Sequence, residues 1–383
     1  MAYGRIKPSD VHIGRPLQWD VFDEKGNLLL GKGHVISSEN QLVRLLQLGM
    51  FADNAALQRS RGDVVIDETL PPSTVTLLLV ARKKLETLFT QLEQATLEDN
   101  FVARMHEIVA HVEGGCSVNP NVALAMILLR QDGRYAIRHM VNAAVVVNLV
   151  CKSMGKTEDE RRRIVAATLS MNFGMMDYQD KLKQQTTPLT PEQRAELEQH
   201  PFKSRELLAN AGVLDELWLT AVLQHHEYID GSGYPGKLKG DSVCQEAQLV
   251  SLADLFCARV TPRAYRAAVA SNVALRGILL DRGKAFNPLL AAHFIKTLGI
   301  YPAGMMVKLA NGEIGLVSEP TEKANCPIVS SFIGPRGAPL TIVLKRDTSL
   351  DLYAIRETVD PKSFAVHINM ENIWGSAAVE YRI

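Results

Sequence analysis

One stretch of this chain, HHEYIDGSGYP at residues 225–235, decides how the rest is interpreted. It joins two adjacent histidines and two acids to a glycine-rich turn, and imidazole and carboxylate groups are common ligands of divalent ions. Neighbouring side chains of a helix point about 100° apart. We therefore expect His225 and His226 to reach different ions, or one a metal and the other a substrate, rather than to bind one ion side by side. The turn ends a helix and exposes backbone N–H groups, which predicts a contact with phosphate.

Helical patterns extend from this stretch in both directions, over about residues 72–299. Residues 75–95, VTLLLVARKKLETLFTQLEQA, repeat apolar side chains at i, i+3 and i+4, as the buried face of a helix does. Thr190-Pro191-Glu192-Gln193 is a capping box with proline at the first helical position, and Asn287-Pro288 opens a helix that Gly299 closes. These patterns predict a mainly α fold with a helical bundle as its core.

The N-terminal end has a different pattern. Apolar and polar residues alternate around a turn at Asp23–Asn27, which predicts a hairpin. A capping box at Ser38–Gln41 then predicts a helix that stops at Gly49, and residues 61–69 resemble a linker.

Strand patterns return after Pro302. An Asn-Gly pair inside residues 307–317 is typical of a two-residue hairpin, and TIVLKR (341–346) and FAVHI (364–368) are further strand candidates. The expected domains are a small α/β N-terminal module (1–60), a linker and helical region (61–125), a helical domain (126–300) and a β-rich C-terminal module (301–383).

The composition excludes several classes of protein. Lys and Arg total 42 and Asp and Glu total 42 in 383 residues, so no net charge attracts the chain to nucleic acid or to a membrane. Five cysteines without paired spacing indicate reduced thiols. The N-terminus has no apolar signal segment, and the longest apolar run, residues 140–150, is too short to span a bilayer. We expect a soluble cytoplasmic protein.

Four of the ten histidines fall in the middle of the helical region and are candidate ligands: His139, His200, His225 and His226. Asp254 lies in the apolar segment QLVSLADLFCARV, where a carboxylate is costly unless it is paired or bound to metal. We expect Asp254 and three of these histidines to converge on one pocket, with His200 at its edge. The other six histidines are interpreted as surface or satisfied core residues.

Three segments together resemble a known family. HHEYIDGSGYP, ADLFCARVTPRAYR (253–266) and GIYPAGMMVKLANGEIGLV (299–317) are similar to the HD-GYP family of cyclic di-GMP phosphodiesterases, a branch of the HD hydrolases, over roughly residues 126–318. The resemblance implies a cluster of two or more iron or manganese ions inside the bundle. It implies metal ligation by His139, His200, His225, His226 and Asp254, and ligand binding by Gly231, Gly233, Tyr234, Arg263 and Arg266.

The chain departs from the family at the motif that names it. Where the family has L-H-D-x-G-K, this chain reads Leu169-Ser170-Met171-Asn172-Phe173-Gly174-Met175, so the histidine, aspartate and lysine are replaced by Met171, Asn172 and Met175. A neutral amide bridges two dications poorly, a thioether prefers softer metals, and Met175 carries no charge for a phosphate. The position at i−4 from His139, often acidic in the family, is Tyr135.

Three functions remain open at this point. The first is a non-catalytic receptor, adaptor or regulator in bacterial cyclic di-GMP signalling, which binds the dinucleotide or a signalling protein and retains iron or manganese at reduced occupancy, if at all. The second is a phosphodiesterase that works slowly with an altered or mononuclear metal site. The third is a scaffold that binds no nucleotide. The strand-rich ends contain no Ser/His/Asp set and no phosphate loop, so we interpret them as interaction surfaces, for a partner or a homodimer.

Overall fold

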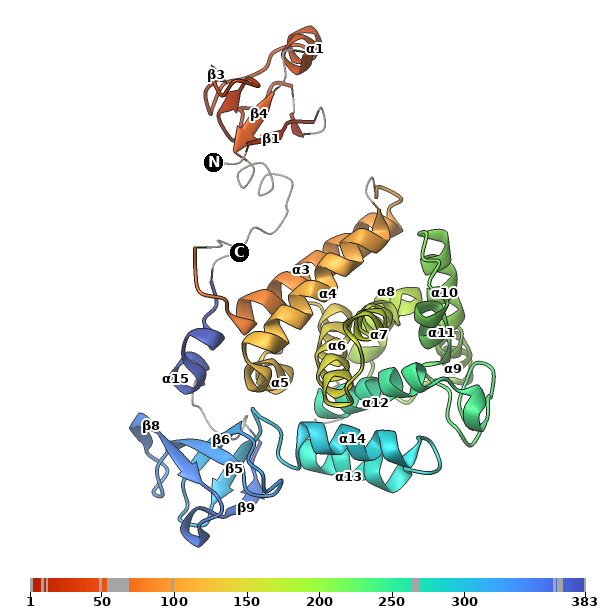
Figure 1. The fold of residues 1–383 in the computed structure, drawn as a ribbon, viewed down its shortest axis with the longest axis vertical. Helices are drawn as coiled ribbons and strands as arrows, with labels where there is room; N and C mark the ends of the chain where they lie inside the picture. Colours follow the sequence, from red (N-terminus) through yellow and green to blue (C-terminus); the bar gives the residue numbers. More distant parts are fainter. Residues whose placement is uncertain are drawn as a thin grey trace. The chain divides into compact units, whose positions relative to one another are not determined.

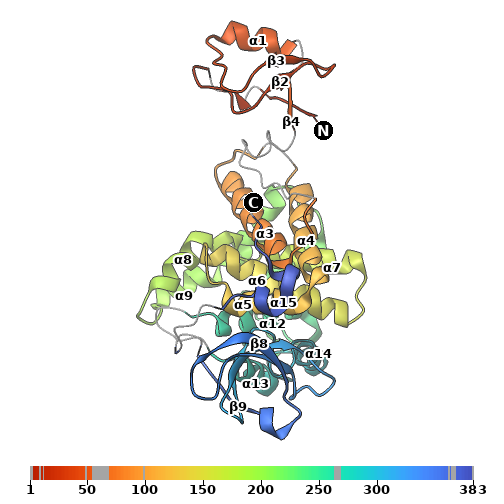
Figure 2. The same cartoon turned by 90° about the vertical axis from the view of Figure 1, so that its left-hand side faces the viewer.

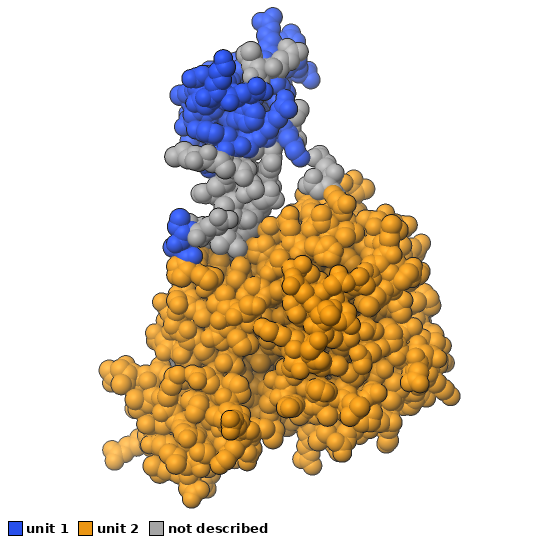
Figure 3. Space-filling model, viewed as in Figure 1, with its two compact units in different colours: residues 1–70, 383 blue, residues 71–382 orange. Residues whose placement is uncertain are grey.

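The computed structural model describes residues 3–7, 10–11, 13–47, 50–53, 69–97, 100–262, 269–360, 363 and 368–381. They belong to two compact units, residues 1–70 with 383 and residues 71–382 (Figure 3). Several predicted features lie outside the described residues: the helix stop at Gly49, most of the linker at 61–69, most of the strand at 364–368, and both Arg263 and Arg266.

The N-terminal unit is a small antiparallel sheet with one helix. Its strands are β1 (Tyr3–Arg5), β2 (Val21–Phe22), β3 (Leu28–Leu30) and β4 (Phe51–Asp53), in the order β1-β4-β2-β3, and its helix is α1 (Glu39–Gln47). The turn predicted between β2 and β3 forms because Asp23 Oδ1 accepts the backbone N–H groups of Lys25 (2.9 Å) and Asn27 (2.8 Å). Trp19, Val21 and Ile36 are buried in the core of this unit.

The second unit begins with a bundle of helices (Figure 1). In chain order they are α3 (Thr74–Glu93), α4 (Phe101–Val118), α5 (Pro120–Leu129), α6 (Tyr135–Ser153), α7 (Glu158–Ser170), the 3-10 turn η2 (Phe173–Met175), α8 (Met176–Gln184), α9 (Pro191–Glu198), α10 (His200–Asn210), α11 (Glu216–Gln224), the 3-10 turn η3 (Gly240–Ser242), α12 (Gln245–Val260), α13 (Ser271–Asp281) and α14 (Pro288–Leu298).

Helix α6 is the centre of the bundle. It is buried along nearly its whole length, including the polar side chains of Asn142 and Asn148, and it packs against α3, α4, α5, α7, α12 and α14. The predicted capping box of α9 is present, since Thr190 and Gln193 each bond the other's backbone N–H. These helix starts and stops position the loops that carry the site.

After the bundle comes a five-stranded antiparallel sheet in the order β8-β7-β6-β5-β9. Its strands are β5 (Met306–Leu309), β6 (Ile314–Glu319), β7 (Ile328–Ile333), β8 (Pro339–Asp347) and β9 (Ile355–Thr358), with the 3-10 turn η4 (Asp351–Tyr353) before β9. The predicted Asn-Gly hairpin joins β5 to β6, with Gly312 at φ +88° in the left-handed region.

The chain then returns to the bundle through α15 (Glu371–Trp374) and the 3-10 turn η6 (Gly375–Ala378), which lie beside α3 and α5 (Figure 2). Tyr381 N donates to Thr76 Oγ1 (2.9 Å), and Thr76 Oγ1 donates to Val379 O (3.2 Å), so the last described residues are tied to the start of α3.

The prediction of a mainly helical protein with small antiparallel sheets towards both ends is confirmed. Within the described part of the chain, no helix on its own combines the length and the apolar character needed to cross a membrane.

Candidate metal and ligand site

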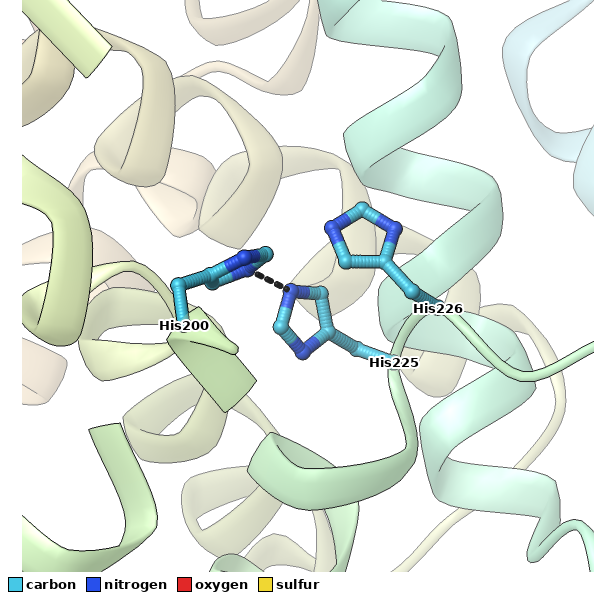
Figure 4. Close-up of side chains that lie close together, drawn as sticks. All are labelled: His200, His225 and His226. Atoms are coloured by element: carbon cyan, nitrogen blue, oxygen red, sulfur yellow. Dashed lines mark hydrogen bonds between the residues drawn. The ribbon is translucent and has the colours of Figure 1, made fainter. Parts of the chain in front are cut away.

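Three imidazoles meet in the bundle. His200 is the first residue of α10, His225 is the C-terminal cap of α11, and His226 follows it. Each offers a ring nitrogen, and the three nitrogens lie within 4.8 Å of one another (Figure 4). We call these residues the three-histidine cluster.

Two expectations about the cluster were wrong. The neighbouring rings of His225 and His226 have centroids only 4.2 Å apart, because the helix ends at this pair and the helical 100° offset no longer applies. His200 was expected at the edge of the pocket, yet its Nε2 lies 3.1 Å from His225 Nε2 (Figure 4).

Backbone carbonyls fix the tautomers of two of these rings. His200 Nδ1 lies 2.6 Å from Leu197 O, and His225 Nδ1 lies 2.6 Å from Val222 O. A carbonyl only accepts, so each Nδ1 donates and each Nε2 carries a lone pair. The two Nε2 lone pairs face each other and cannot bond while both rings are neutral.

Burial keeps the rings neutral. It lowers the pKa of His200 to about 3, with a further contribution from His225, and it also lowers the pKa of His225 and His226. Neutral rings whose nitrogens converge, two of them buried and His226 half-buried, form the arrangement that a divalent cation needs, so the three-histidine cluster fits one metal ion.

His139 and Asp254 form a pair beside the cluster. His139 Nε2 lies 2.6 Å from Asp254 Oδ1, joining α6 to α12. Burial by itself would raise the pKa of Asp254, but the hydrogen bond with His139 and the nearby histidines lower it below the usual range of a carboxyl. The negative charge of Asp254 also acts on the three clustered histidines. It raises their pKa values and so offsets part of the lowering that burial causes. The structure therefore brings the five predicted ligands into one region, and their role as ligands remains a prediction.

The two residues predicted to replace the family's histidine and aspartate are both buried. Met171 is fully buried in the apolar core. Asn172 is 1% exposed, and neither atom of its side-chain amide has a hydrogen-bond partner among the described residues. Leaving such an amide unpaired costs about 1–3 kcal/mol, so the position suits a water or an ion as its partner. It does not fit a carboxylate bridge, because the amide is neutral.

The other two motif positions are Gly174, which packs tightly against α10, and Met175, which lines a groove. A Cβ on Gly174 would lie 2.6 Å from Ser204 N and 2.7 Å from His200 O, so only glycine lets η2 pack against the first turn of α10. Met175 is half-buried and lines a groove of about 600 Å³ with Phe89 and Leu207. None of the five predicted ligands lines this groove.

The loop that contains Gly233, Tyr234 and Pro235 lies over the three-histidine cluster. The ring of Tyr234 stacks on His226, with centroids 4.6 Å apart and 26° between the planes. Burial raises the pKa of Tyr234, so its hydroxyl remains protonated. The backbone N–H groups of Gly231, Ser232 and Tyr234 donate within the loop, to Tyr228 O, Asp230 Oδ1 and His226 O. These three amides therefore fix the loop, and the predicted contact with phosphate remains a prediction.

Two residues of the site were not singled out from the sequence. The buried carboxylate of Glu227 accepts the backbone N–H groups of Gly236 and Leu238 (3.0 Å for the latter), which anchors the loop. Ser204 Oγ accepts from Gly174 N (2.9 Å) and donates to Met171 O (2.8 Å), joining the motif segment to α10. Glu227 could have been found from the sequence, because it is an acid directly after the two histidines. No pattern in the sequence indicates the role of Ser204.

Gly233→Ala is expected to move the loop off the cluster. The added Cβ would lie 2.5 Å from His226 O and 2.5 Å from Tyr228 N, both backbone atoms that cannot yield. We expect a loss of stability of about 2 kcal/mol or more, within the range for overpacking, measured by thermal unfolding. Gly114→Ala in α4 is the control, because its Cβ would meet Leu77 Cδ1 at an ordinary 3.5 Å. Equal unfolding temperatures for Gly233→Ala and wild type would contradict the packing described here.

Comparison with known proteins concerns mainly the helical part of the chain. Residues 124–290 match the HD domain family. Over 217 residues the chain is 25% identical to the cyclic di-GMP phosphodiesterase PA4108 of Pseudomonas aeruginosa, covering 57% of this chain and 52% of that protein. Over 194 residues it is 29% identical to the cyclic di-GMP phosphodiesterase response regulator RpfG of Xanthomonas campestris pv. campestris, covering 50% of each. The chain thus spans about half the length of the curated relatives it matches.

Among solved structures, the HDG"Y"P protein Bd1817 of Bdellovibrio bacteriovorus aligns with a TM-score of 0.49 and 18% identity, covering 78% of this chain and 99% of that one. The match of residues 124–290 to the HD domain family, together with two relatives that are named cyclic di-GMP phosphodiesterases, confirms the resemblance indicated by the sequence.

Proposed function

We propose that this protein binds cyclic di-GMP and acts through that binding, as a receptor, adaptor or regulator, and not through rapid hydrolysis. The names of the relatives support the ligand. The observation that carries the non-catalytic part is Asn172, a buried neutral amide at the position of the family's aspartate. The regulated partner would be another signalling protein or a second copy of this chain, in the cytoplasm.

The chemistry of phosphodiester hydrolysis explains why Asn172 matters. A two-ion site clamps the attacking and leaving oxygens, and a bridging carboxylate offsets the charge of two close dications. Asp254 is the described carboxylate beside the histidines, and it is bonded to His139. The groups present therefore suit one ion better than two.

A single ion would be held by His200, His225 and His226. When bound, it would supply positive charge to a phosphate oxygen of the ligand. The chain's own part is to keep the three rings neutral by burial and to fix two of them through Leu197 O and Val222 O. Tyr234 covers His226 and would limit the access of water.

The three-histidine cluster also favours a second candidate, a slow cyclic di-GMP phosphodiesterase that uses one ion. Its support is that Asp254, a carboxylate kept ionised, lies close enough to the cluster to influence all three rings. In that case Asp254 would help to hold the ion and to orient an attacking water, because a carboxylate with a lowered pKa is a weak base.

One experiment separates the two candidates. Protein purified anaerobically is titrated with cyclic di-GMP by calorimetry, and the same samples are followed for linear dinucleotide by chromatography, with and without added iron(II) or manganese(II). Binding without turnover supports the receptor. Turnover that His226→Ala abolishes supports the phosphodiesterase. Neither binding nor turnover would overturn both.

Replacing Arg263 and Arg266 together by alanine is expected to weaken cyclic di-GMP binding strongly. By the family resemblance these two cations contact the ligand phosphates, and a charge-assisted hydrogen bond contributes roughly 1.5–3 kcal/mol. We expect the dissociation constant to rise at least tenfold in the same calorimetric titration. The control is Arg276→Ala, at an exposed arginine of helix α13. An unchanged dissociation constant in the double variant would show that the phosphates are held elsewhere.

A further inference from the structure

The five-stranded sheet ends in a long edge strand. β8 has nine residues and pairs with β7 alone in the sheet order β8-β7-β6-β5-β9 (Figure 1). Its outer edge therefore presents backbone N–H and C=O groups to which no described strand is paired. A further extended strand can add to such an edge through main-chain hydrogen bonds.

The middle of β8 also departs from its one neighbour. Leu344 pairs with Ser331 and Pro339 pairs with Ile333, so five steps along β8 correspond to two steps along β7. Three extra residues thus lie in β8 between these two pairs, and a bulge of this kind bends the strand and leaves the extra residues unpaired. Many proteins protect an edge with charges or proline, but the segment 340–343, LTIV, contains neither.

The bulged segment is apolar and lies outside the hydrophobic cores. Ile342 is 67% exposed, and Leu340 and Leu344 are half-buried. Within the described part of the chain, none of these three side chains belongs to a cluster of buried or partly buried apolar residues. Side chains at alternate positions of a strand share one face, so these three form an apolar strip on the edge strand.

The charged residues of β8 are already engaged within the chain. Lys345 pairs with Glu319 (2.5 Å), and Arg346 forms a two-point ion pair with Glu313 (2.8 Å for each contact). Asp347 Oδ1 accepts a backbone N–H from the turn that follows the strand (2.9 Å). β8, all of which is described, therefore offers a partner its backbone and its apolar side chains, and the complementary partner is a neutral, apolar strand.

We propose that β8 is a dimer surface, to which β8 of a second copy of this chain adds as an antiparallel strand. Pairing of identical surfaces about a twofold axis is the commonest symmetry of homo-oligomers. The inference selects the second copy from the partners that the proposed function leaves open, and it applies with or without bound dinucleotide.

The sequence of β8 is complementary to itself in one antiparallel register. When Ile342 of the two copies lie opposite each other, Leu340 of each copy faces Leu344 of the other, so the two apolar strips join into one aliphatic ladder. The same register places Lys345 opposite the partner's Pro339, so no like charges face each other.

Sedimentation velocity over a range of protein concentrations tests this dimer. One pair of strands is a small interface, so we expect wild type to shift from monomer to dimer as its concentration rises. Ile342→Lys should raise the dissociation constant of the dimer at least about a hundredfold, because two ammonium groups would face each other at the axis. The control is Leu280→Lys on α13, since Leu280 is 69% exposed and so matches Ile342. It should leave the constant within about twofold.

Two further measurements identify the strand and its register. A mixture of Ile342→Lys and Ile342→Glu should recover the dimer, because opposite charges then meet at the axis, while each variant alone stays monomeric. Hydrogen exchange followed by mass spectrometry should show slower exchange of the amides of residues 340–344 in concentrated than in dilute wild type. Ile342→Lys should show no such difference, and it should unfold at the wild-type temperature in dilute solution.

Wild type that remains monomeric at every concentration would overturn this inference, and the edge would then be open to a strand of another protein. A dimer that Ile342→Lys leaves intact would overturn it too, since another surface would hold the copies together. Failure of the mixed variants to dimerise would overturn the antiparallel register. None of these outcomes involves cyclic di-GMP, whose binding is titrated separately, so failure of this inference is distinguishable from failure of the proposed function.

Discussion

The wild-type protein is expected to hydrolyse cyclic di-GMP at least about a hundredfold more slowly than a relative with an intact HD pair, even with added iron(II) or manganese(II). The reason is Asn172, which is neutral, buried and without a partner among the described residues. The measurement is single-turnover conversion of cyclic to linear dinucleotide by metal-loaded protein, with a cyclic di-GMP phosphodiesterase whose motif contains the histidine and the aspartate assayed beside it. Rates within a few-fold of each other would mean that the altered motif is a working variant.

The complementary change is Met171→His with Asn172→Asp and Met175→Lys. The aspartate restores a charged bridging group beside the histidines, so metal content measured by elemental analysis should rise towards two ions per chain. The structure adds a cost, because Met171 is fully buried in the apolar core and an imidazole there loses its hydration. We therefore expect the metal-free triple variant to unfold at a lower temperature than wild type.

The structure indicates that the three substituted positions, 171, 172 and 175, contribute unequally to metal binding. Met175 lines a groove that none of the predicted ligands lines, so Met171→His with Asn172→Asp should recover nearly all of the metal that the triple variant recovers. A double variant that remains at wild-type metal content, while the triple variant gains an ion, would show that a lysine at 175 reaches the site.

The second large effect is expected from His225→Ala. Removing this ring takes away one of the two facing Nε2 atoms, and a three-ligand site that loses one ligand should bind its ion at least a hundredfold more weakly. An ion present at about 100 times its dissociation constant stabilises a protein by about 2.7 kcal/mol. We therefore expect added manganese(II) or zinc(II) to raise the unfolding temperature of wild type by several degrees and to leave His225→Ala unchanged.

The matched control for this experiment is His293→Ala. His293 is an exposed histidine on α14, and its loss should leave the metal-induced shift intact. If wild type shows no shift with any divalent ion, the three-histidine cluster is a structural arrangement of neutral rings and the one-ion phosphodiesterase loses its support.

Most of the fold follows from local patterns in the sequence. The apolar stripe of residues 75–95 became α3, the capping box at Thr190 opens α9, and the Asn-Gly pair turns β5 into β6. Each of these signals acts over a few residues, through hydrogen bonds or a single apolar face, so the sequence contains it completely. The prediction that Met171 and Asn172 replace the HD pair also comes from the sequence alone.

The tertiary structure decided how the candidate residues meet. Helix periodicity suggested that His225 and His226 diverge, but the helix ends at this pair and their rings lie together. No sequence spacing shows that His200 Nε2 faces His225 Nε2 or that Ser204 joins the motif to α10. These contacts join segments 25 and 33 residues apart. Their geometry depends on how the helices pack around α6, a property of the whole bundle that no local pattern contains.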